Sequence, residues 1–322
     1  MNRRSPTSAP TLLRRRSRAL ARHLAGALSG DGRGVHRARV ASRRLRELLP
    51  VVAAAVEEGS PGKARKIVRR LTRALGAVRE LDVTLGLLDG VARRTDMPDA
   101  AFEDVRARML DERQQRRAGM LQRVGEADIA KLTRRLRRLA GALEEADEGR
   151  WREALARRVV GRARRLRAAV EQAGRIYAAD RLHDVRIAAK KLRYALEIAV
   201  ESGVRAAAGP VRALKRVQDA LGRLHDLQVL QAHLAAVQAE PAAGAALQGG
   251  RLAPAASALE EECRHRHAEY VGAIPALLEA CEAARGVVAT ELAARAAPRS
   301  RVARMRLRSR ARPGGARAAA GE

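Results

Sequence analysis

Aromatic residues are nearly missing from this sequence, where they make up 2% of 322 residues, and cysteine occurs only at Cys263 and Cys281. A core without aromatic rings must be built from alanine, leucine and valine. Alanine, leucine and arginine are strong helix formers, whereas strands favour aromatic and β-branched residues. Two cysteines do not make a disulfide framework, which fits a reducing cytoplasmic setting. We therefore expect an all-α protein of the cytoplasm.

Long apolar runs are also missing. The longest one, from Leu48 to Val56, is interrupted by Pro50 and is too short to span a bilayer. The basic amino-terminal segment lacks the continuous apolar stretch of a secretory signal. These absences predict a soluble protein that does not insert into a membrane.

Acidic residues are too few to balance the basic ones. The chain has 65 Lys plus Arg against 36 Asp plus Glu, which gives a formal net charge of +29. Lysine occurs six times, and codon bias accounts for that preference for arginine but not for the excess of charge. Such an excess causes self-repulsion that a polyanionic partner would relieve. Nucleic acid, an anionic membrane surface and polyphosphate all qualify as partners at this level.

Amphipathic segments of helical period fill most of the chain and are separated by short breaks rich in glycine, proline and aspartate. Helices joined by short turns favour antiparallel bundles. We divide the chain into a flexible amino terminus (residues 1–11), two halves (12–150 and 151–294) and a tail (295–322). The tail carries nine arginines and almost no large apolar residue, which predicts a disordered basic segment.

An internal repeat relates the two halves. The segment VHRARVASRRLRELL around His36 matches LHDVRIAAKKLRYAL around His183. A second block, KIVRRLTRALGAVRELDVTL from Lys66, matches RALKRVQDALGRLHDLQVL from Arg212 in the same order and at nearly the same spacing. Two blocks that recur in order predict a duplicated helical unit, with halves that resemble four-helix bundles.

Each repeated block places basic residues opposite apolar ones on a helical wheel. In the first block, His36, Arg39, Arg43 and Arg46 share an arc of about 80° and extend about 15 Å along the axis. Ala38, Leu45 and similar residues occupy the opposite face. Like charges stacked one turn apart repel unless an anion lies along them, whereas an ordinary solvated face mixes signs. One position breaks the pattern, because Asp219 stands where the first half has Arg73.

His36 and His183 begin their basic stripes at equivalent positions. We place both in the first turn of a helix, where unpaired N–H groups and the helix dipole suit a phosphate. A packing or hydrogen-bonding role is the alternative for each histidine. A phosphate at this place would favour the protonated imidazole, so we expect tighter binding at mildly acidic pH.

These motifs resemble the CHAD family, the conserved histidine α-helical domain. The resemblance rests on HRARVASRRLR at His36, HDVRIAAKKLRYAL at His183 and the two ALG segments at Ala74 and Ala220, and it covers residues 12 to 290. It implies two helical bundles around a basic central groove that binds inorganic polyphosphate, and an association with polyphosphate granules. Carried over by position, the polyphosphate-binding residues are His36, Arg39, Arg43, Arg46, Lys66, Arg69, Arg70, Arg73, His183, Arg186, Lys190, Arg193, Arg212, Lys215 and Arg216.

An enzymatic function finds no support in the sequence. It contains no P-loop, no G-x-S-x-G, no HExxH and no ExExK motif. Cys263 and His267 would share a helix face, but two candidate ligands are too few for a closed metal site. We expect a protein without catalytic residues, metal or cofactor.

Nonspecific binding of DNA or RNA is the alternative function. A protein of charge +29 binds nucleic acids at low salt through phosphate contacts, and the arginine-rich tail could add to this. Single-strand binders usually also offer aromatic stacking platforms. Of the few aromatic residues, Tyr194 lies nearest to a basic stripe.

Overall fold

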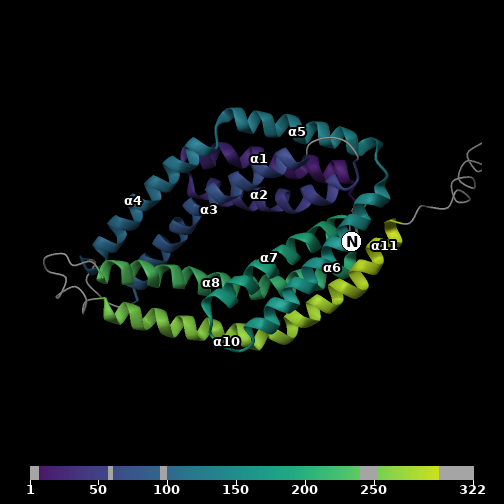
Figure 1. The fold of residues 1–322 in the computed structure, drawn as a ribbon. Coiled ribbons are helices and arrows are strands. Elements are labelled where there is room, and N and C mark those ends of the chain that lie inside the picture. Colours follow the sequence, from purple (N-terminus) through teal and green to yellow (C-terminus); the bar gives the residue numbers. More distant parts are fainter. Residues whose placement is uncertain (1–6, 57–60, 95–99, 240–251, 297–322) are drawn as a thin grey trace, which may run out of the picture.

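The computed structural model describes residues 7–56, 61–94, 100–239 and 252–296, and within these ranges the chain is helical and contains no strand (Figure 1). The prediction of an all-α fold is confirmed. The helices of the amino-terminal part are α1 (Ala9–Ser29), α2 (Gly32–Ala53), α3 (Pro61–Ala92), α4 (Ala100–Arg123) and α5 (Glu126–Glu145). Those of the carboxyl-terminal part are α6 (Glu148–Ala173), α7 (Ala179–Glu201), η1 (Arg205–Ala207), α8 (Ala208–Gln238), α10 (Ala253–Ala283), η2 (Ala284–Val288) and α11 (Ala289–Ala296).

The outermost helices extend slightly beyond the segment bounds inferred from the sequence. Helix α1 starts at Ala9 rather than at residue 12, and α11 continues to Ala296 rather than ending at 294. Residues 1–6 of the proposed flexible amino terminus and residues 297–322 of the arginine-rich tail lie outside the described residues. No helix in the described ranges is long and apolar enough to cross a membrane.

The start of α2 shows how the sequence sets a helix boundary. Asp31 is the N-cap, and its carboxylate accepts hydrogen bonds from the backbone N–H groups of Arg33 and Gly34. His36 is therefore the fifth residue of α2, and His183 is likewise the fifth residue of α7. The prediction that both histidines lie in a first turn was wrong, because the helices begin one turn earlier. Two of the free N–H groups at the start of α2 are satisfied by this aspartate.

Each part is built from helices that pack against their sequence neighbours. Helix α2 packs between α1 and α3, α4 packs on α3, and α5 returns along α1. In the second part α7 packs between α6 and α8, α10 lies along α8, and α11 lies along α6. The two parts meet where α2 contacts α6 and α7 and where α3 contacts α8 (Figure 1). Helices α2 and α7, which carry the first repeated block, thus lie at the junction.

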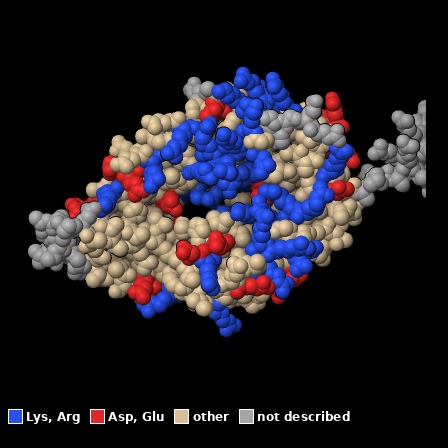
Figure 2. Space-filling view, viewed as in Figure 1, with Lys and Arg blue, Asp and Glu red and all other residues tan. Residues whose placement is uncertain are grey.

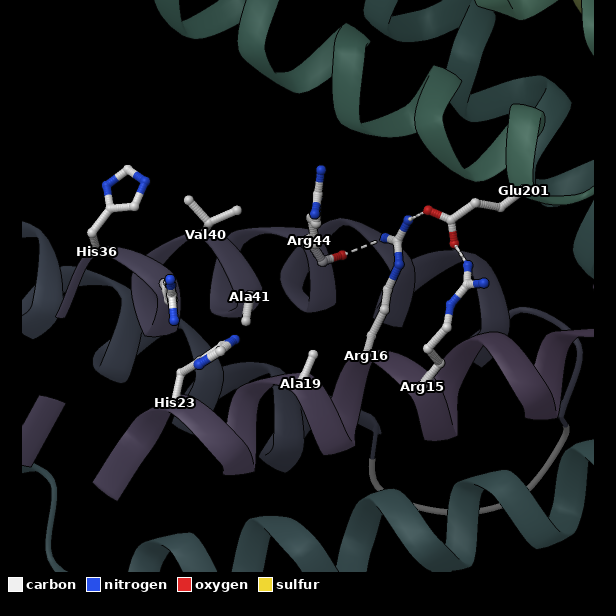
Figure 3. Close-up of a pocket in the computed structure, with 10 residues that line it drawn as sticks. Arg15, Arg16, Ala19, His23, His36, Val40, Ala41, Arg44 and Glu201 are labelled. Carbon is white, nitrogen blue, oxygen red and sulfur yellow. Dashed lines mark hydrogen bonds and ion pairs between the residues drawn. The ribbon is translucent and has the colours of Figure 1, made fainter. Parts of the chain in front are cut away.

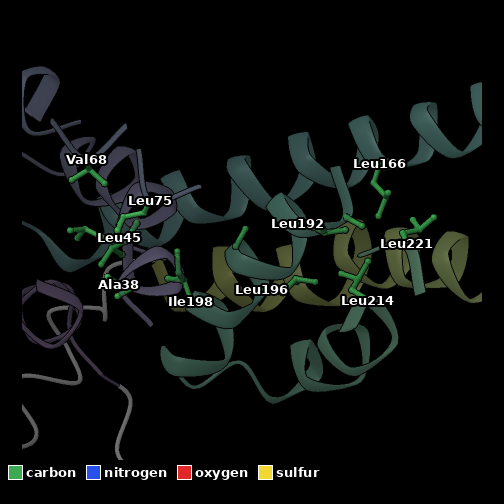
Figure 4. Close-up of a cluster of buried hydrophobic side chains, with 14 of the residues drawn as sticks. Ala38, Leu45, Val68, Leu75, Leu166, Leu192, Leu196, Ile198, Leu214 and Leu221 are labelled. Atoms are coloured by element: carbon green, nitrogen blue, oxygen red, sulfur yellow. The ribbon is translucent and has the colours of Figure 1, made fainter. Parts of the chain in front are cut away.

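The core is one continuous cluster of buried leucine, alanine and valine side chains (Figure 4). The apolar stripe predicted for α2 is buried, as Ala38 and Leu45 show, and so is that of α3 at Val68 and Leu75. In α7 the apolar stripe is buried at Leu192. The side chains of its basic stripe are exposed to solvent to different degrees. Burial of the apolar stripes therefore turns the opposite, basic faces toward the junction and the surface.

Candidate polyanion-binding site

Four basic side chains come together where α2 meets α7. Arg39 and Arg43 belong to α2, whereas Arg186 and Lys190 belong to α7. Besides burial, the charge of Arg43 lowers the pKa of both α7 residues, and the charge of Arg186 lowers that of Arg39. We call these four residues the central cluster. Figure 2 shows lysine and arginine side chains gathered around a hollow in the middle of the molecule, between the amino-terminal and carboxyl-terminal helices.

The helical period explains why these four residues converge. In α2, Arg39 and Arg43 are one turn apart, and Arg186 and Lys190 repeat that spacing in α7. Burial of Leu45 and Leu192 fixes the rotation of each helix about its axis. Because α2 and α7 contact each other, their basic stripes approach across the junction. Arg39 also lies beside α3, where its Nε atom is close to Gly76.

The central cluster forms no ion pair with the residues that the structure describes. In the described ranges, no carboxylate oxygen lies within 4.0 Å of a charged nitrogen of these four side chains. The Nε atoms of Arg39 and Arg186 are buried and have no hydrogen-bond acceptor. Buried polar groups in folded proteins are nearly always hydrogen-bonded, and buried charges are nearly always paired. An anion bound at the cluster would supply the missing hydrogen-bond acceptors and the missing negative charge.

The pKa values of three residues in the cluster are lowered, first by burial and then by neighbouring positive charges. Burial, followed by the charges of Arg43, Arg186 and Arg39, lowers the pKa of Lys190 from 10.5 to about 6. Burial and then Arg43 lower the pKa of Arg39 to about 10. Burial is also the main cause of the lowered pKa of Arg186. Without an anion, Lys190 is thus mostly neutral at pH 7, while the guanidinium groups stay charged.

Two carboxylates border the cluster without pairing to it. Asp226 of α8 has a pKa raised by burial, an effect that Arg186 and other nearby cations partly oppose. Glu80 of α3 lies 3.4 Å from Nε2 of His225, measured to its Oε1 atom, and the hydrogen bond from that histidine lowers its pKa. The His225 ring in turn lies 5.1 Å from the His183 ring, centroid to centroid. These groups connect α3, α7 and α8 at one edge of the cluster.

His36 and His183 lie at the margins of the same region. Burial is the main cause of the lowered pKa of each ring, with the next contribution from Arg79 for His36 and from Arg186 for His183. Both imidazoles are therefore disfavoured as cations while the site holds no anion. A bound phosphate would reverse that preference, because an opposite charge favours the protonated form.

Comparison with known proteins places this arrangement in a family. The CHAD domain model matches residues 11–235, more than two thirds of the chain. The chain belongs to the CHAD family. The crystal structure of the CHAD domain from the plant Ricinus communis shares its fold, with a TM-score of 0.59 and 22% identity over 87% of this chain and 94% of that one. PptA from Streptomyces chartreusis is also similar, with a TM-score of 0.54 and 19% identity over 87% of this chain and 99% of that one. None of the curated protein sequences matches the chain.

The other basic residues singled out in this CHAD domain occupy different places. Arg46 lies close to Arg43, and burial, followed by that charge, lowers its pKa. Arg193 is partly engaged, since it donates to Gln218 at 2.8 Å and pairs with Glu197 at 2.7 Å. The side chains on the exposed faces of α3 and α8 are Lys66, Arg69, Arg70, Arg73, Arg212, Lys215 and Arg216.

Some of these exposed residues face away from the central cluster or are already paired. Arg70 pairs with Asp128 of α5, and Arg73 lines a hollow between α3 and α4. Lys215 pairs with Asp219 at 2.9 Å, so the acidic residue that breaks the repeat neutralises a lysine one turn away. The structure thus brings the α2 and α7 stripes together, whereas the side chains of the α3 and α8 stripes are exposed.

Sequence reasoning missed the acidic groups around the CHAD cluster. Glu80 and Asp226 lie in the two copies of the second repeated block, after the basic residues that were predicted to bind polyphosphate. His225 stands where the first half has Arg79, and Arg79 itself lies near His36. Both repeats share a glycine that is followed, one or two turns later, by a carboxylate or a histidine. This pattern in the sequence could have identified these residues.

The aromatic residues of this CHAD domain are mostly buried. Trp151, Phe102 and Tyr270 belong to the core, and Tyr194 is 6% exposed beneath the guanidinium of Arg193. Only Tyr177, which accepts a hydrogen bond from Gln228, is exposed among the five aromatic side chains.

The residues considered for a metal site serve other contacts. Cys263 is buried beside Gln231, and the His267 ring packs edge-on against Tyr177. No group of three or more potential metal ligands is found in the parts of the chain that the structure describes.

Proposed function

We propose that this CHAD domain binds inorganic polyphosphate without catalysing a reaction, and that the central cluster is the heart of the binding site. The observation that carries the proposal is the convergence of Arg39, Arg43, Arg186 and Lys190 from two helices with no carboxylate within 4.0 Å of their charged nitrogens. Holding these basic side chains together destabilises the free protein. A ligand that carries several negative charges would offset that free-energy cost.

Polyphosphate fits the chemistry of this cluster. It is a flexible chain with about one negative charge per phosphate unit, and it carries no nucleobases that a protein could recognise. Guanidinium groups form two parallel hydrogen bonds to phosphate oxygens, and charge-assisted bonds of this kind are about twice as strong as neutral ones. Successive phosphates could contact α2 and α7 together, so affinity should rise with chain length. His36 and His183 at the margins and the exposed stripes of α3 and α8 would then contact further units of a long chain.

Nucleic-acid binding is the second candidate. The net charge of +29 supports it in general terms, because phosphate contacts and counterion release suffice for nonspecific binding. The burial of Tyr194 and of the core aromatics speaks against single-strand recognition, since stacking needs accessible rings. The ligand in the central cluster should therefore be a phosphate chain rather than a base-bearing strand.

A salt series distinguishes the two functions. Binding of long polyphosphate, duplex DNA and single-stranded RNA to the full chain would be measured from low to physiological salt and beyond. If polyphosphate remains bound at physiological salt while both nucleic acids dissociate, the site is dedicated to polyphosphate. If all three weaken with the same slope, the domain is a general cationic surface and nucleic-acid binding becomes the leading function. A fourth arm with triphosphate tests the dependence on chain length.

We also propose that polyphosphate binding brings this protein to polyphosphate granules in the cytoplasm. The support is the same cluster, since a granule presents a high local concentration of the ligand. Fluorescence microscopy of the labelled protein tests this, with the Arg43→Gln, Lys190→Met double variant as the control. Equal granule association of both proteins would contradict a role for the cluster.

A further inference from the structure

A second basic hollow lies between α1 and α2, where the carboxyl-terminal end of α7 approaches (Figure 3). Its volume is about 610 Å³, within the range of about 300–1,000 Å³ that is typical of small-molecule sites. We call it the α1–α2 pocket. Its lining residues from α1 are Arg15, Arg16, Ala19 and His23; those from α2 are His36, Arg37, Val40, Ala41 and Arg44; and Glu201 comes from α7.

The α1–α2 pocket and the central cluster lie on different faces of α2. On a helical wheel, Arg37 and Arg44 are more than about 90° around the axis from Arg39 and Arg43. His36 lies between the two faces. Arg37 and Arg44 therefore lie on a different side of α2 from the central cluster, and His36 is the one histidine that borders both.

At one end of the pocket the cations are already neutralised. Arg16 is buried, donates to the carbonyl oxygen of Arg44 at 2.8 Å and pairs with Glu201 at 3.0 Å. Arg15 also pairs with Glu201, and Arg44 pairs with Glu197 at 2.9 Å. This end is rigid and nearly neutral, and the carboxylate of Glu201 makes it unfavourable for a phosphate.

At the other end the polar side chains are free. His23, His36 and Arg37 form no hydrogen bond or ion pair with any part of the chain that the structure describes. In Figure 3, His23 from α1 and His36 from α2 lie on the same side of the pocket, away from Glu201. Arginine and protonated histidine donate charge-assisted hydrogen bonds to phosphate oxygens. This end therefore offers a place for one or two phosphoryl groups.

Between the two ends the pocket is floored by Ala19, Val40 and Ala41. These side chains offer no donor to a phosphate oxygen, and a bare phosphate chain laid over them would lose hydration without compensation. A flat or apolar group would instead be stabilised there by burial. The order of chemistry along the pocket is thus cationic, apolar and then a carboxylate held by arginines.

We propose that the α1–α2 pocket binds an organic phosphate of nucleotide size. Its phosphoryl groups contact Arg37, His23 and His36, its planar group lies over Val40, and an amino group on that plane donates to Glu201. This site goes beyond the proposed polyphosphate site, because its remaining lining residues are not those of the central cluster and His36 is the residue that the two sites share. The protein would then carry two phosphate-binding sites of different selectivity.

Isothermal titration of the full chain with ADP and with pyrophosphate tests this proposal. We expect one ADP per chain, and at least tenfold weaker binding of pyrophosphate, which lacks the planar group. Arg37→Gln and Val40→Phe should each weaken ADP binding at least fivefold, the first by removing the free guanidinium and the second by filling the floor. Arg22→Gln, an exposed arginine of α1 that does not line the pocket, is the matched control and should change it less than twofold.

Three outcomes would overturn the proposal. One is pyrophosphate binding as tightly as ADP, and another is an Arg22→Gln effect as large as that of Arg37→Gln. The third is loss of ADP binding in the Arg43→Gln, Lys190→Met double variant, which would make the pocket part of the polyphosphate path. Because Arg37 is exposed, its variant should fold normally, and circular dichroism would verify the helix content of Val40→Phe. A failure of polyphosphate binding with retained ADP binding would leave this site standing and contradict only the proposed function.

Discussion

Lys190 and Arg43 come from different parts of the chain, and after burial the charge of Arg43 is the largest cause that lowers the pKa of Lys190 to about 6. The two side chains belong to equivalent positions of the repeated block, on α7 and α2. Because the two side chains lie close together, protonation of Lys190 creates a repulsion between the two parts of the protein. A ligand that carries negative charge converts that repulsion into a shared attraction.

Lys190→Met should stabilise the free protein and weaken polyphosphate binding. The folded pKa of Lys190 lies below its unfolded value, so the unfolded chain binds more protons and the wild type loses stability as pH falls from about 10 to 6. Methionine removes this penalty, and we expect a gain on the order of 1–2 kcal/mol at pH 7. Urea unfolding measures the gain, and titration measures the loss of affinity, which we expect to be about tenfold.

Lys131→Met is the matched control for that variant. Lys131 lies exposed on α5, away from the central cluster. Its replacement should change the unfolding free energy by less than about 0.5 kcal/mol, as is usual at the surface. If Lys190→Met destabilised the protein, the lysine would have a partner that the proposed electrostatics do not contain.

Polyphosphate affinity should fall as pH rises from 6 to 8. Bound phosphate requires protonated Lys190, which loses its proton above pH 6 in the free protein, so each binding event takes up a proton in this range. The affinity should fall by up to about tenfold per pH unit for each proton taken up. The lowered pKa values of His36 and His183 act in the same direction below pH 6.5. Titration in buffers of different ionisation enthalpy counts the protons, and a flat affinity from pH 5.5 to 8 would contradict the prediction.

Asp226→Asn should tighten polyphosphate binding. The carboxylate of Asp226 lies near Arg186 and Lys190, and it repels an incoming phosphate from within the site. The amide keeps the shape and removes the charge, so we expect an affinity gain of about threefold to tenfold, a coupling of about 1 kcal/mol. Asp111→Asn on α4 is a control for the change in net charge alone. An equal gain from both variants would mean that only the overall charge of the protein matters.

Much of the fold could be predicted from residue patterns, because the dominant constraint is local. Apolar residues at helical spacing must be buried, and Leu45, Leu75 and Leu192 are buried as their period requires. Short breaks at glycine and aspartate set the helix ends, as Asp31 does for α2. The first-turn position of His36 was misjudged because the glycines before it read as a break, whereas Asp31 caps the helix ahead of them.

The candidate site was predictable only in part, since it depends on how helices pack. Sequence spacing shows that Arg39 and Arg43 share a face, and only the packing of α2 against α7 shows that they meet Arg186 and Lys190. The same spacing groups Arg70 and Arg73, which the structure turns toward α5 and α4. A helical wheel gives the direction of a side chain relative to its own axis, but not which neighbour that direction faces.

The different placement of α2 and α3 arginines leads to a comparison of two variants. Arg43→Gln removes a charge from the central cluster and should weaken polyphosphate binding by about tenfold, close to the loss of one charge-assisted hydrogen bond. Arg70→Gln removes a charge of the same kind that is paired with Asp128. We expect a loss of less than threefold for it at physiological salt. Equal losses would show that the exposed stripe of α3 contributes as much as the central cluster.

Glu47→Gln should destabilise the junction of the two parts. Glu47 of α2 is buried, and its carboxylate accepts from Arg158 Nε at 2.6 Å and from Arg162 Nε at 3.1 Å, both from α6. A neutral amide would leave two partly buried guanidinium groups without a counter-charge, a loss of about 3–5 kcal/mol when a buried pair is broken. The exposed pair of Glu153 and Arg157 provides the control, since Glu153→Gln should cost about 0.5 kcal/mol or less. Urea unfolding measures both variants, and a Glu47→Gln effect below 1 kcal/mol would show that the contact of α2 with α6 is held by apolar packing rather than by this carboxylate.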